Sequence, residues 1–140
     1  MIVYTGGTFD ILHAGHIELL KTCRKLAGGG SVVVSLNTDE FIQKYKGEYP
    51  VNIYSSRRAL LTACRYVDEV IPNLGGPDSK PAILATQPDI IVVGQDWVTK
   101  DYYQQMGFTQ AWLDNLNITL VYTPLVLGLA SSKLRRHICE

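Results

Sequence analysis

Short runs of β-branched residues alternate with stretches of helical periodicity along the whole chain. Continuous Val and Ile content is typical of strands that are covered on both faces, so the pattern predicts a parallel sheet. The predicted strands are 2–4, 31–36, 69–71, 89–93 and 118–122.

Apolar positions spaced three and four residues apart predict helices between these strands. The clearest helix runs over 16–27 and is stopped by a run of glycines. A second helix begins at Ser55 or Ser56, because serine is a good N-cap residue. The remaining predicted helices are 100–115, interrupted at Gly107, and 131–138.

This alternation predicts right-handed βαβ connections and one α/β domain spanning 1–140. We expect a single-domain, Rossmann-like, doubly wound parallel sheet of about five strands with helices on both faces. Ligands of such sheets bind at the carboxyl ends of the strands, where the strand order reverses. The segment 43–53 contains Gly47 and Pro50 and is predicted to be a loop long enough to cover such a site.

Composition narrows the class of protein. Of the 140 residues, 46% are apolar and 19% are charged, which is typical of a compact soluble globule. Thirteen basic and thirteen acidic residues balance to zero, so no overall positive field would recruit nucleic acid. The most apolar runs are far shorter than the ~18 residues of a membrane span, and the first residues carry no targeting signature, so we expect a cytoplasmic protein with no membrane partner. The widely spaced Cys23, Cys64 and Cys139 form no C-x-x-C pair and are expected to be reduced thiols.

The segment 6–16, GGTFDILHAGH, lies between the first predicted strand and the first predicted helix. Gly6 and Gly7 let the backbone turn sharply and approach a ligand closely. The helix start would direct free N–H groups and the positive end of its dipole toward that ligand, for which phosphate is the natural candidate. The segment matches neither the Walker pattern nor the dinucleotide fingerprint.

His13 and His16 stand three residues apart at this helix start. Two imidazoles at that spacing can converge on one oxyanion as hydrogen-bond donors. A pair of capping or solvated histidines is the alternative for any such pair taken alone. A metal site is the other alternative, but the third ligand and the H-E-x-x-H spacing of a zinc enzyme are missing, so no metal ligand is assigned.

The pattern GTFD-x-x-H-x-G-H resembles the signature of the nucleotidyltransferase superfamily of cytidylyltransferase type. The stretches RYVDEVIP at 65–72 and GQDW at 94–97 resemble blocks of the glycerol-3-phosphate cytidylyltransferases, the family to which the chain is most similar. The stretch KGEYPVN at 46–52 is similar to the adenylyltransferase domain that makes ADP-heptose. The resemblance covers nearly the whole chain, and it implies a homodimer.

The resemblance implies that CTP condenses with glycerol 3-phosphate, or with a similar phosphorylated alcohol or sugar. Mg²⁺ would arrive with the triphosphate. An oxygen of the acceptor's phosphate attacks the α-phosphorus directly and releases pyrophosphate, so the protein positions the reactants and neutralises charge. The implied catalytic residues are His13, His16, Lys44 and Lys46. The implied nucleotide-binding residues are Gly7, Thr8, Phe9, Asp10, His13, Gly15, His16, Arg65, Gly94, Asp96, Trp97, Gly128, Ser131 and Ser132.

Lys46, Arg57 and Asp68 are the residues that the resemblance implies for binding the acceptor. Arg57 begins a predicted helix, where a cation opposes the helix dipole, so an anionic partner is expected there. An ion pair within a helix or at a subunit interface is the alternative for Asp68 and Arg65. Solvation on the loop is the alternative for each lysine.

Asp96 and Trp97 follow the predicted strand that ends near Gly94. An indole and a carboxylate at the carboxyl end of a strand suit a nucleobase, the one by stacking and the other by accepting from an exocyclic amine. Packing in the core is the alternative for Trp97.

The stretch LVLGLASS at 125–132 departs from the family's RTEGISTT. Gly128, Ser131 and Ser132 keep a turn and hydroxyl groups at a predicted helix start, which suits phosphate. The arginine and the glutamate are lost, and an aliphatic side chain does not replace an arginine fork. Two alternatives therefore stand beside the cytidylyltransferase: an adenylyltransferase acting on a sugar phosphate, and a nucleotide-binding domain without catalysis.

Overall fold

Five parallel strands form one sheet in the computed structural model, which describes residues 1–94 and 106–123. The strand order is β3-β2-β1-β4-β5. In chain order the strands are β1 (Ile2–Gly7), β2 (Ser31–Leu36), β3 (Glu69–Pro72), β4 (Ile90–Gly94) and β5 (Thr119–Thr123). The predicted strands and the doubly wound α/β architecture are confirmed.

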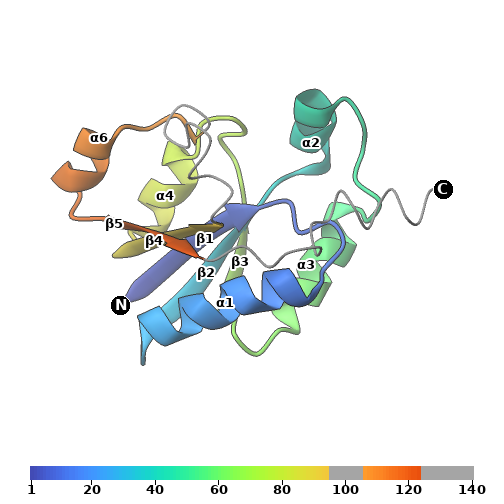
Figure 1. Cartoon of the computed structure of the whole chain (residues 1–140). Coiled ribbons are helices and arrows are strands. Elements are labelled where there is room, and N and C mark those ends of the chain that lie inside the picture. The colour runs from blue at the N-terminus through green and yellow to red at the C-terminus, as the bar shows by residue number, and fades with distance from the viewer. Residues whose placement is uncertain (95–105, 124–140) are drawn as a thin grey trace.

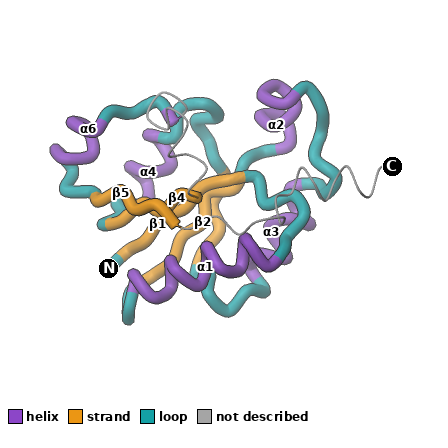
Figure 2. The backbone as a smooth tube through the Cα atoms, viewed as in Figure 1, coloured by secondary structure: helices purple, strands orange, loops and turns teal. Residues whose placement is uncertain are grey.

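Helices cover both faces of this sheet (Figure 1). The helices α1 (Ala14–Ala27) and α3 (Tyr54–Thr62) lie on one face, and α4 (Lys80–Thr86) and α6 (Gln110–Asn115) lie on the other. The helix α2 (Asp39–Lys46) follows β2 and stands beyond the carboxyl edge of the sheet, where the tube in Figure 2 shows it set apart from the other helices.

Several predicted helix boundaries were wrong. The expected loop 43–53 begins inside α2, which was not predicted, because it is short and buries only Ile42. The predicted N-caps Ser55 and Ser56 lie inside α3, which starts one residue earlier. The carboxylate of Asp39, distant in sequence, accepts from the N–H of Tyr54 at 3.1 Å and so caps α3 through a tertiary contact.

The short helix α4 was also missed, and the helix predicted over 100–115 is helical at Gln110–Asn115 after a left-handed backbone at Gly107 (φ 80°). The first part of that predicted helix, 100–105, and the whole helix predicted over 131–138 lie outside the described residues.

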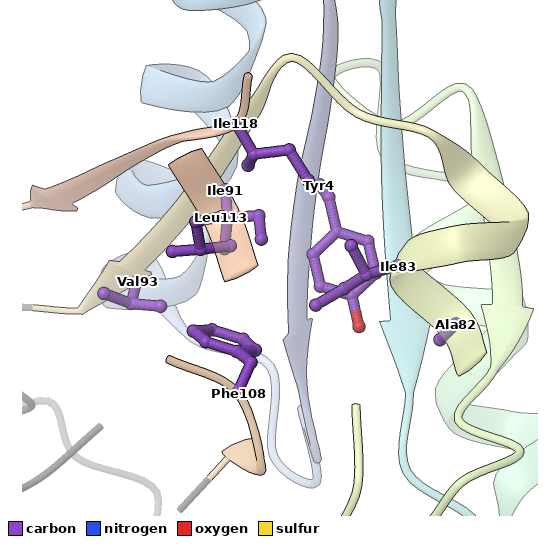
Figure 3. Close-up of a cluster of buried hydrophobic side chains, with 8 residues drawn as sticks. All are labelled: Tyr4, Ala82, Ile83, Ile91, Val93, Phe108, Leu113 and Ile118. Atoms are coloured by element: carbon purple, nitrogen blue, oxygen red, sulfur yellow. The ribbon is translucent and has the colours of Figure 1, made fainter. Parts of the chain in front are cut away.

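Side chains of the central strands alternate between two cores. Val3 and Val92 pack with Cys23 of α1 on one face. Tyr4 and Ile91 point to the other face, where they pack with residues of α4 and α6 (Figure 3). Cys23 is buried as a free thiol, as expected, whereas the free thiol Cys64 lies beyond the end of α3 and is half-buried.

The strand order reverses at β1, because β2 and β3 lie on one side of it and β4 and β5 on the other. The carboxyl ends of β1 and β4 are therefore the place where such a sheet binds its ligand. Among the described helices, none has the length and hydropathy needed to cross a bilayer.

Candidate active site

The turn that leaves β1 is shaped by Gly7 and Phe9. A Cβ atom on Gly7 would stand 3.1 Å from the Phe9 ring, so a larger residue would displace that ring. Phe9 is buried and holds a left-handed backbone (φ 48°), which costs energy for a bulky residue. Its ring packs on His16 with centroids 5.1 Å apart. The strained turn thus places the GTFD segment directly against the start of α1.

His13 and His16 are held by backbone hydrogen bonds at the start of α1. His13 is the N-cap residue, and its Nδ1 accepts from the N–H of Gly15 at 3.0 Å. Nδ1 of His16 accepts in turn from the N–H of His13 at 3.2 Å. The two rings stack with centroids 3.9 Å apart. The capping role that the sequence left open is therefore real, and it leaves Nε2 of both rings outside the capping bonds.

These bonds determine the tautomer of each imidazole. A ring nitrogen that accepts from a backbone N–H carries no proton, so each neutral ring holds its proton on Nε2. Burial lowers the pKa of His13. Burial, together with the nearby His13, lowers the pKa of His16 to about 4. At neutral pH the pair therefore offers two Nε2–H donors without bearing charge.

One of these donors is unsatisfied. Nε2 of His13 is shielded from solvent and has no hydrogen-bond partner among the described residues. Buried polar atoms are nearly always paired, and leaving one unpaired costs about 1–3 kcal/mol. The atom lies at the N-terminus of α1, where the helix dipole favours negative charge. The arrangement suits an oxyanion that accepts from His13.

A row of hydrogen-bonded side chains follows the carboxyl ends of three strands. Thr8, Asn37 and Asn73 come after β1, β2 and β3 respectively. Nδ2 of Asn37 donates to Oγ1 of Thr8 at 3.1 Å, and Nδ2 of Asn73 donates to Oδ1 of Asn37 at 2.9 Å. Because Oγ1 of Thr8 already accepts, its own proton is directed elsewhere, which suits a phosphate oxygen.

Asp10 connects this turn to the segment between α2 and α3. Its buried carboxylate accepts from the N–H groups of Val51 and Asn52, both at 2.8 Å. The Asn52 side chain donates back to the carbonyl oxygen of Asp10 at 2.6 Å. Asp10 was expected to bind the nucleotide, and in the structure its carboxylate holds the loop that precedes α3.

Arg57 occupies the centre of the loop network and is fully buried (0% exposed). Its guanidinium donates to three main-chain carbonyl oxygens, those of Thr8, Asn37 and Asn52, at 2.8–2.9 Å. It also forms an ion pair with Asp39 at 2.6 Å. Arg57 was expected to contact the acceptor's phosphate, but its described bonds are to main-chain carbonyl oxygens and Asp39 within the protein.

Lys44 and Lys46 lie in the last turn of α2 and are exposed. Since α2 stands at the carboxyl edge, both lysines are on the same side of the sheet as the histidine pair. The structure therefore brings the two implied catalytic groups to one edge, on a helix rather than on the expected loop.

Asp68 and Arg65 lie apart from the histidine pair at the start of α1. Asp68 accepts from Arg24 and from the N–H of Val32, both at 2.7 Å. Val32 pairs with Val3 near the amino ends of the strands, and a rise of ~3.3 Å per residue places this pair about 13 Å from the carboxyl edge. Arg65 is exposed and lies over the Tyr66 ring. Within one chain the structure does not bring either residue to the histidines. Asp68 pairs with Arg24 of α1, which is distant in sequence, so its ion pair is neither within a helix nor at a subunit interface.

Gly15 is in the first turn of α1 and Gly94 ends β4, both at the carboxyl edge. The other expected nucleotide-binding residues lie outside the described residues, and they are Asp96, Trp97, Gly128, Ser131 and Ser132. Among the residues that the structure does describe, no three His, Cys, Asp or Glu side chains form a group that could hold a metal ion.

Sequence reasoning missed Asn37, Asp39, Asn52 and Asn73. A polar residue immediately after a predicted strand was the available signal for Asn37 and Asn73. No local pattern indicates Asp39 or Asn52, because their side chains bond Tyr54 and Asp10, which lie 15 and 42 positions away in the chain.

Comparison with known proteins agrees with this geometry. The cytidylyltransferase-like family model matches residues 4–137, and the chain belongs to this family of nucleotidyltransferases. The chain is 37% identical over 138 residues to the glycerol-3-phosphate cytidylyltransferase of Bacillus subtilis (strain 168), covering 97% of this chain and 95% of that protein.

Other relatives bear different names. The FAD synthase of Pyrococcus horikoshii is 40% identical over 94 residues, which cover 67% of this chain and 62% of that protein. Among solved structures, the lipopolysaccharide core biosynthesis protein from Thermoplasma volcanium GSS1 is 30% identical, with a TM-score of 0.70 over 90% of this chain and 96% of that one. The family is therefore certain, and its members differ in substrate.

Proposed function

We propose that the protein transfers a cytidylyl group from CTP to glycerol 3-phosphate or a closely similar phosphorylated alcohol, forming a CDP-alcohol and pyrophosphate. The observation that carries the catalytic part is the histidine pair with its two Nε2–H donors at the start of α1. The near full-length similarity to a glycerol-3-phosphate cytidylyltransferase supports the choice of substrates.

In this reaction an oxygen of the acceptor's phosphate attacks the α-phosphorus in line. The bond from the α-phosphorus to the bridging oxygen breaks, and pyrophosphate leaves with the electron pair. The attacking phosphate is already an anion, so no general base is required. Catalysis then depends on alignment and on stabilising the charge that builds on the phosphate oxygens.

His13, His16 and Thr8 are proposed to donate hydrogen bonds to the triphosphate. Neutral imidazole donors suit this role, because they meet the charge that develops without first having to lose a proton. Lys44 and Lys46 are proposed to neutralise the incoming phosphate and the triphosphate. The base is proposed to bind near Asp96 and Trp97.

Mg²⁺ is proposed to enter with the triphosphate, whose oxygens supply most of its ligands. The protein groups at this edge are chiefly N–H and O–H donors, which suit phosphate oxygens that the metal leaves free. When bound, the ion would polarise the phosphates and neutralise part of their charge.

Pyrophosphate release measured with each nucleoside triphosphate, with Mg²⁺ and glycerol 3-phosphate present, tests the proposal. We expect turnover with CTP and production of CDP-glycerol, checked by mass spectrometry. Folded protein that turns over no triphosphate with a panel of alcohol and sugar phosphates would refute an enzymatic function and leave a nucleotide-binding domain.

Adenylyl transfer is the second candidate. It is favoured by the similarity to an FAD synthase, by KGEYPVN at 46–52 and by Leu125 where the cytidylyltransferases carry arginine. Calorimetric titration with CTP and ATP separates the two candidates, and tighter binding of ATP would favour transfer to a sugar phosphate or a flavin phosphate.

A further inference from the structure

The helix α2 carries Lys44 and Lys46 in its last turn, and little of this helix is anchored in the core. It has 8 residues, of which Ile42 is buried, whereas both lysines are exposed. Isolated helices of fewer than about 12 residues are marginal in water, so α2 depends on contacts with other elements. The contacts that keep its last turn formed therefore also decide where the two ammonium groups stand.

The start of α2 is tied to the loop network of the site. Asp39 pairs with Arg57 at 2.6 Å and accepts from the N–H of Tyr54 at 3.1 Å. Thr38 caps the helix by accepting from the N–H of Phe41 at 3.2 Å. These bonds fix the first turn, and none of them reaches the turn that carries the lysines.

The side chain of Phe41 makes the next contact along the helix. Phe41 is half-buried and lies against Gly76 in the turn after β3, because a Cβ atom on Gly76 would stand 3.5 Å from its Cδ1. Gly76 holds a left-handed backbone (φ 58°), and its carbonyl oxygen accepts from Nδ2 of Asn73 at 2.9 Å. Phe41 therefore rests on a turn whose shape is fixed by its own hydrogen bond.

Tyr45 extends this contact into the last turn of α2. Its ring stacks on the Phe41 ring, with centroids 5.8 Å apart and an angle of 24° between the planes. Residues four positions apart on a helix are neighbours, and an aromatic pair at this spacing stabilises the turn between them. Tyr45 stands between Lys44 and Lys46 in the chain. Gly76, Phe41 and Tyr45 therefore connect the turn after β3 to the turn that carries the lysines.

The alternative is that the two rings only stabilise the fold. The clusters of described side chains that pack against the sheet contain neither Phe41 nor Tyr45. Tyr45 is also 54% exposed. Substitutions at these positions should therefore leave the core intact, so their effect on positioning can be measured in folded protein.

We propose that Phe41 and Tyr45, seated on Gly76, are positioning residues that hold the last turn of α2. This turn presents Lys44 and Lys46 to the phosphates beside the histidine pair, so the inference rests on the proposed function and deepens it. The two rings touch no reacting atom and act through the lysines. Charges that are oriented before the reaction stabilise the transition state more than charges that must first be ordered.

Phe41→Leu tests the role of the ring, because it keeps an apolar side chain and removes the stacking. We expect kcat to fall about 3- to 10-fold, while KM for CTP and for glycerol 3-phosphate changes less. Tyr45→Ala, at an exposed position, should have a similar effect. Chemical denaturation checks that both variants are folded at the assay temperature. Unchanged kcat in both variants would overturn the positioning role.

A second pair of variants tests the support beneath Phe41. Gly76→Asn keeps a residue that tolerates the left-handed backbone, and its side chain begins in contact with the Phe41 ring, so it should displace the ring and lower kcat. Leu74→Asn is the matched control, because Leu74 lies in the same turn and is 78% exposed. Equal kcat in the two variants would show that the contact with Gly76 does not position α2.

A double-mutant cycle distinguishes positioning from a structural role. If Phe41 acts through the lysines, Phe41→Leu should have no further effect on kcat in a protein that already carries Lys44→Met and Lys46→Met. The same fold-decrease in both backgrounds would show that Phe41 acts elsewhere, and it would overturn the inference.

Hydrogen exchange separates this inference from the proposed function, because it needs no turnover. The N–H of Gly47 donates to the carbonyl oxygen of Gln43 at 2.8 Å and closes the last turn of α2. In Phe41→Leu and in Tyr45→Ala this amide should exchange roughly 5-fold faster. Faster exchange supports the positioning role even if no triphosphate is consumed, and unchanged exchange refutes it even if CTP is consumed.

Discussion

The main-chain N–H of His13 donates to Nδ1 of His16. This one bond both caps the start of α1 and orients the His16 imidazole. Nδ1 of His13 is bound in the same way by Gly15. The two rings therefore cannot rotate without breaking the start of the helix. Their Nε2–H groups are oriented before any ligand arrives, which is what stabilisation of a developing charge requires.

Replacing His16 by Ala should separate catalysis from binding. Loss of one charge-stabilising donor typically lowers kcat by ~10²- to 10³-fold, while nucleotide affinity falls much less. Steady-state kinetics with calorimetry measures both. Lys21→Ala, exposed on the same helix, is the control. A fall in affinity equal to the fall in turnover would point to a binding domain without catalysis.

Acid should destabilise the protein through the same histidines. The pKa of His16 is about 4 in the folded state, below its ordinary value of 6.5, so the unfolded chain binds more protons between these values. The stabilisation is complete above pH 6.5 and is lost as the pH falls toward 4, at up to about 1.4 kcal/mol per pH unit for one group.

Urea unfolding at pH 7, 6 and 5 measures this slope. His16→Asn keeps an acceptor for the N–H of His13 and does not titrate, so its free energy of unfolding should depend less on pH. An identical slope in the variant would contradict the assigned pKa direction.

Arg57 should be required for stability rather than for contact with substrate. Arg57→Met leaves Asp39 without its charged partner and three carbonyl oxygens without a donor, so a loss of roughly 3–5 kcal/mol is expected. Arg58→Met, the exposed neighbour in α3, should stay within about 0.5 kcal/mol of the parent. Chemical denaturation measures both variants, and similar stabilities would show that the buried network is dispensable.

Asp10 should control the order of the segment that joins α2 to α3. Asp10→Ala removes the acceptor for the N–H groups of Val51 and Asn52, so both amides should exchange with solvent faster, roughly 10-fold or more for ~1.4 kcal/mol of lost local stability. Hydrogen exchange followed by NMR measures this change. Glu69→Gln, exposed at the start of β3, is the control, and unchanged protection in Asp10→Ala would exclude this role.

Local pattern was sufficient where one element makes its own contacts. The buried Val and Ile runs predicted the strands, because a strand covered on both faces requires apolar residues at successive positions. The periodicity of α1 and the glycines after it predicted the longest helix. The short helices α2 and α4 were not predicted, because they bury few residues and their apolar periodicity is therefore weak.

The candidate site likewise contains residues whose roles local sequence predicts and residues whose roles depend on distant partners. Because the GTFD segment and both histidines lie within a few residues of one another, their spacing alone predicted an anion site at the start of α1. The roles of Arg57 and Asp10 depended on partners that are far apart in the chain. Arg57 was expected to meet a phosphate outside the protein, and it instead meets carbonyl oxygens from three separate segments.

The sequence by itself determined the α/β class, the strands of the sheet and the histidine pair, since each of these is encoded by residues that are close neighbours in the chain. Only the tertiary structure decided which residues meet at the carboxyl edge. The order β3-β2-β1-β4-β5 places Thr8, Asn37 and Asn73 in one row. Hydrogen bonds act over about 3 Å, so such a row exists only when folding brings the ends of three strands together.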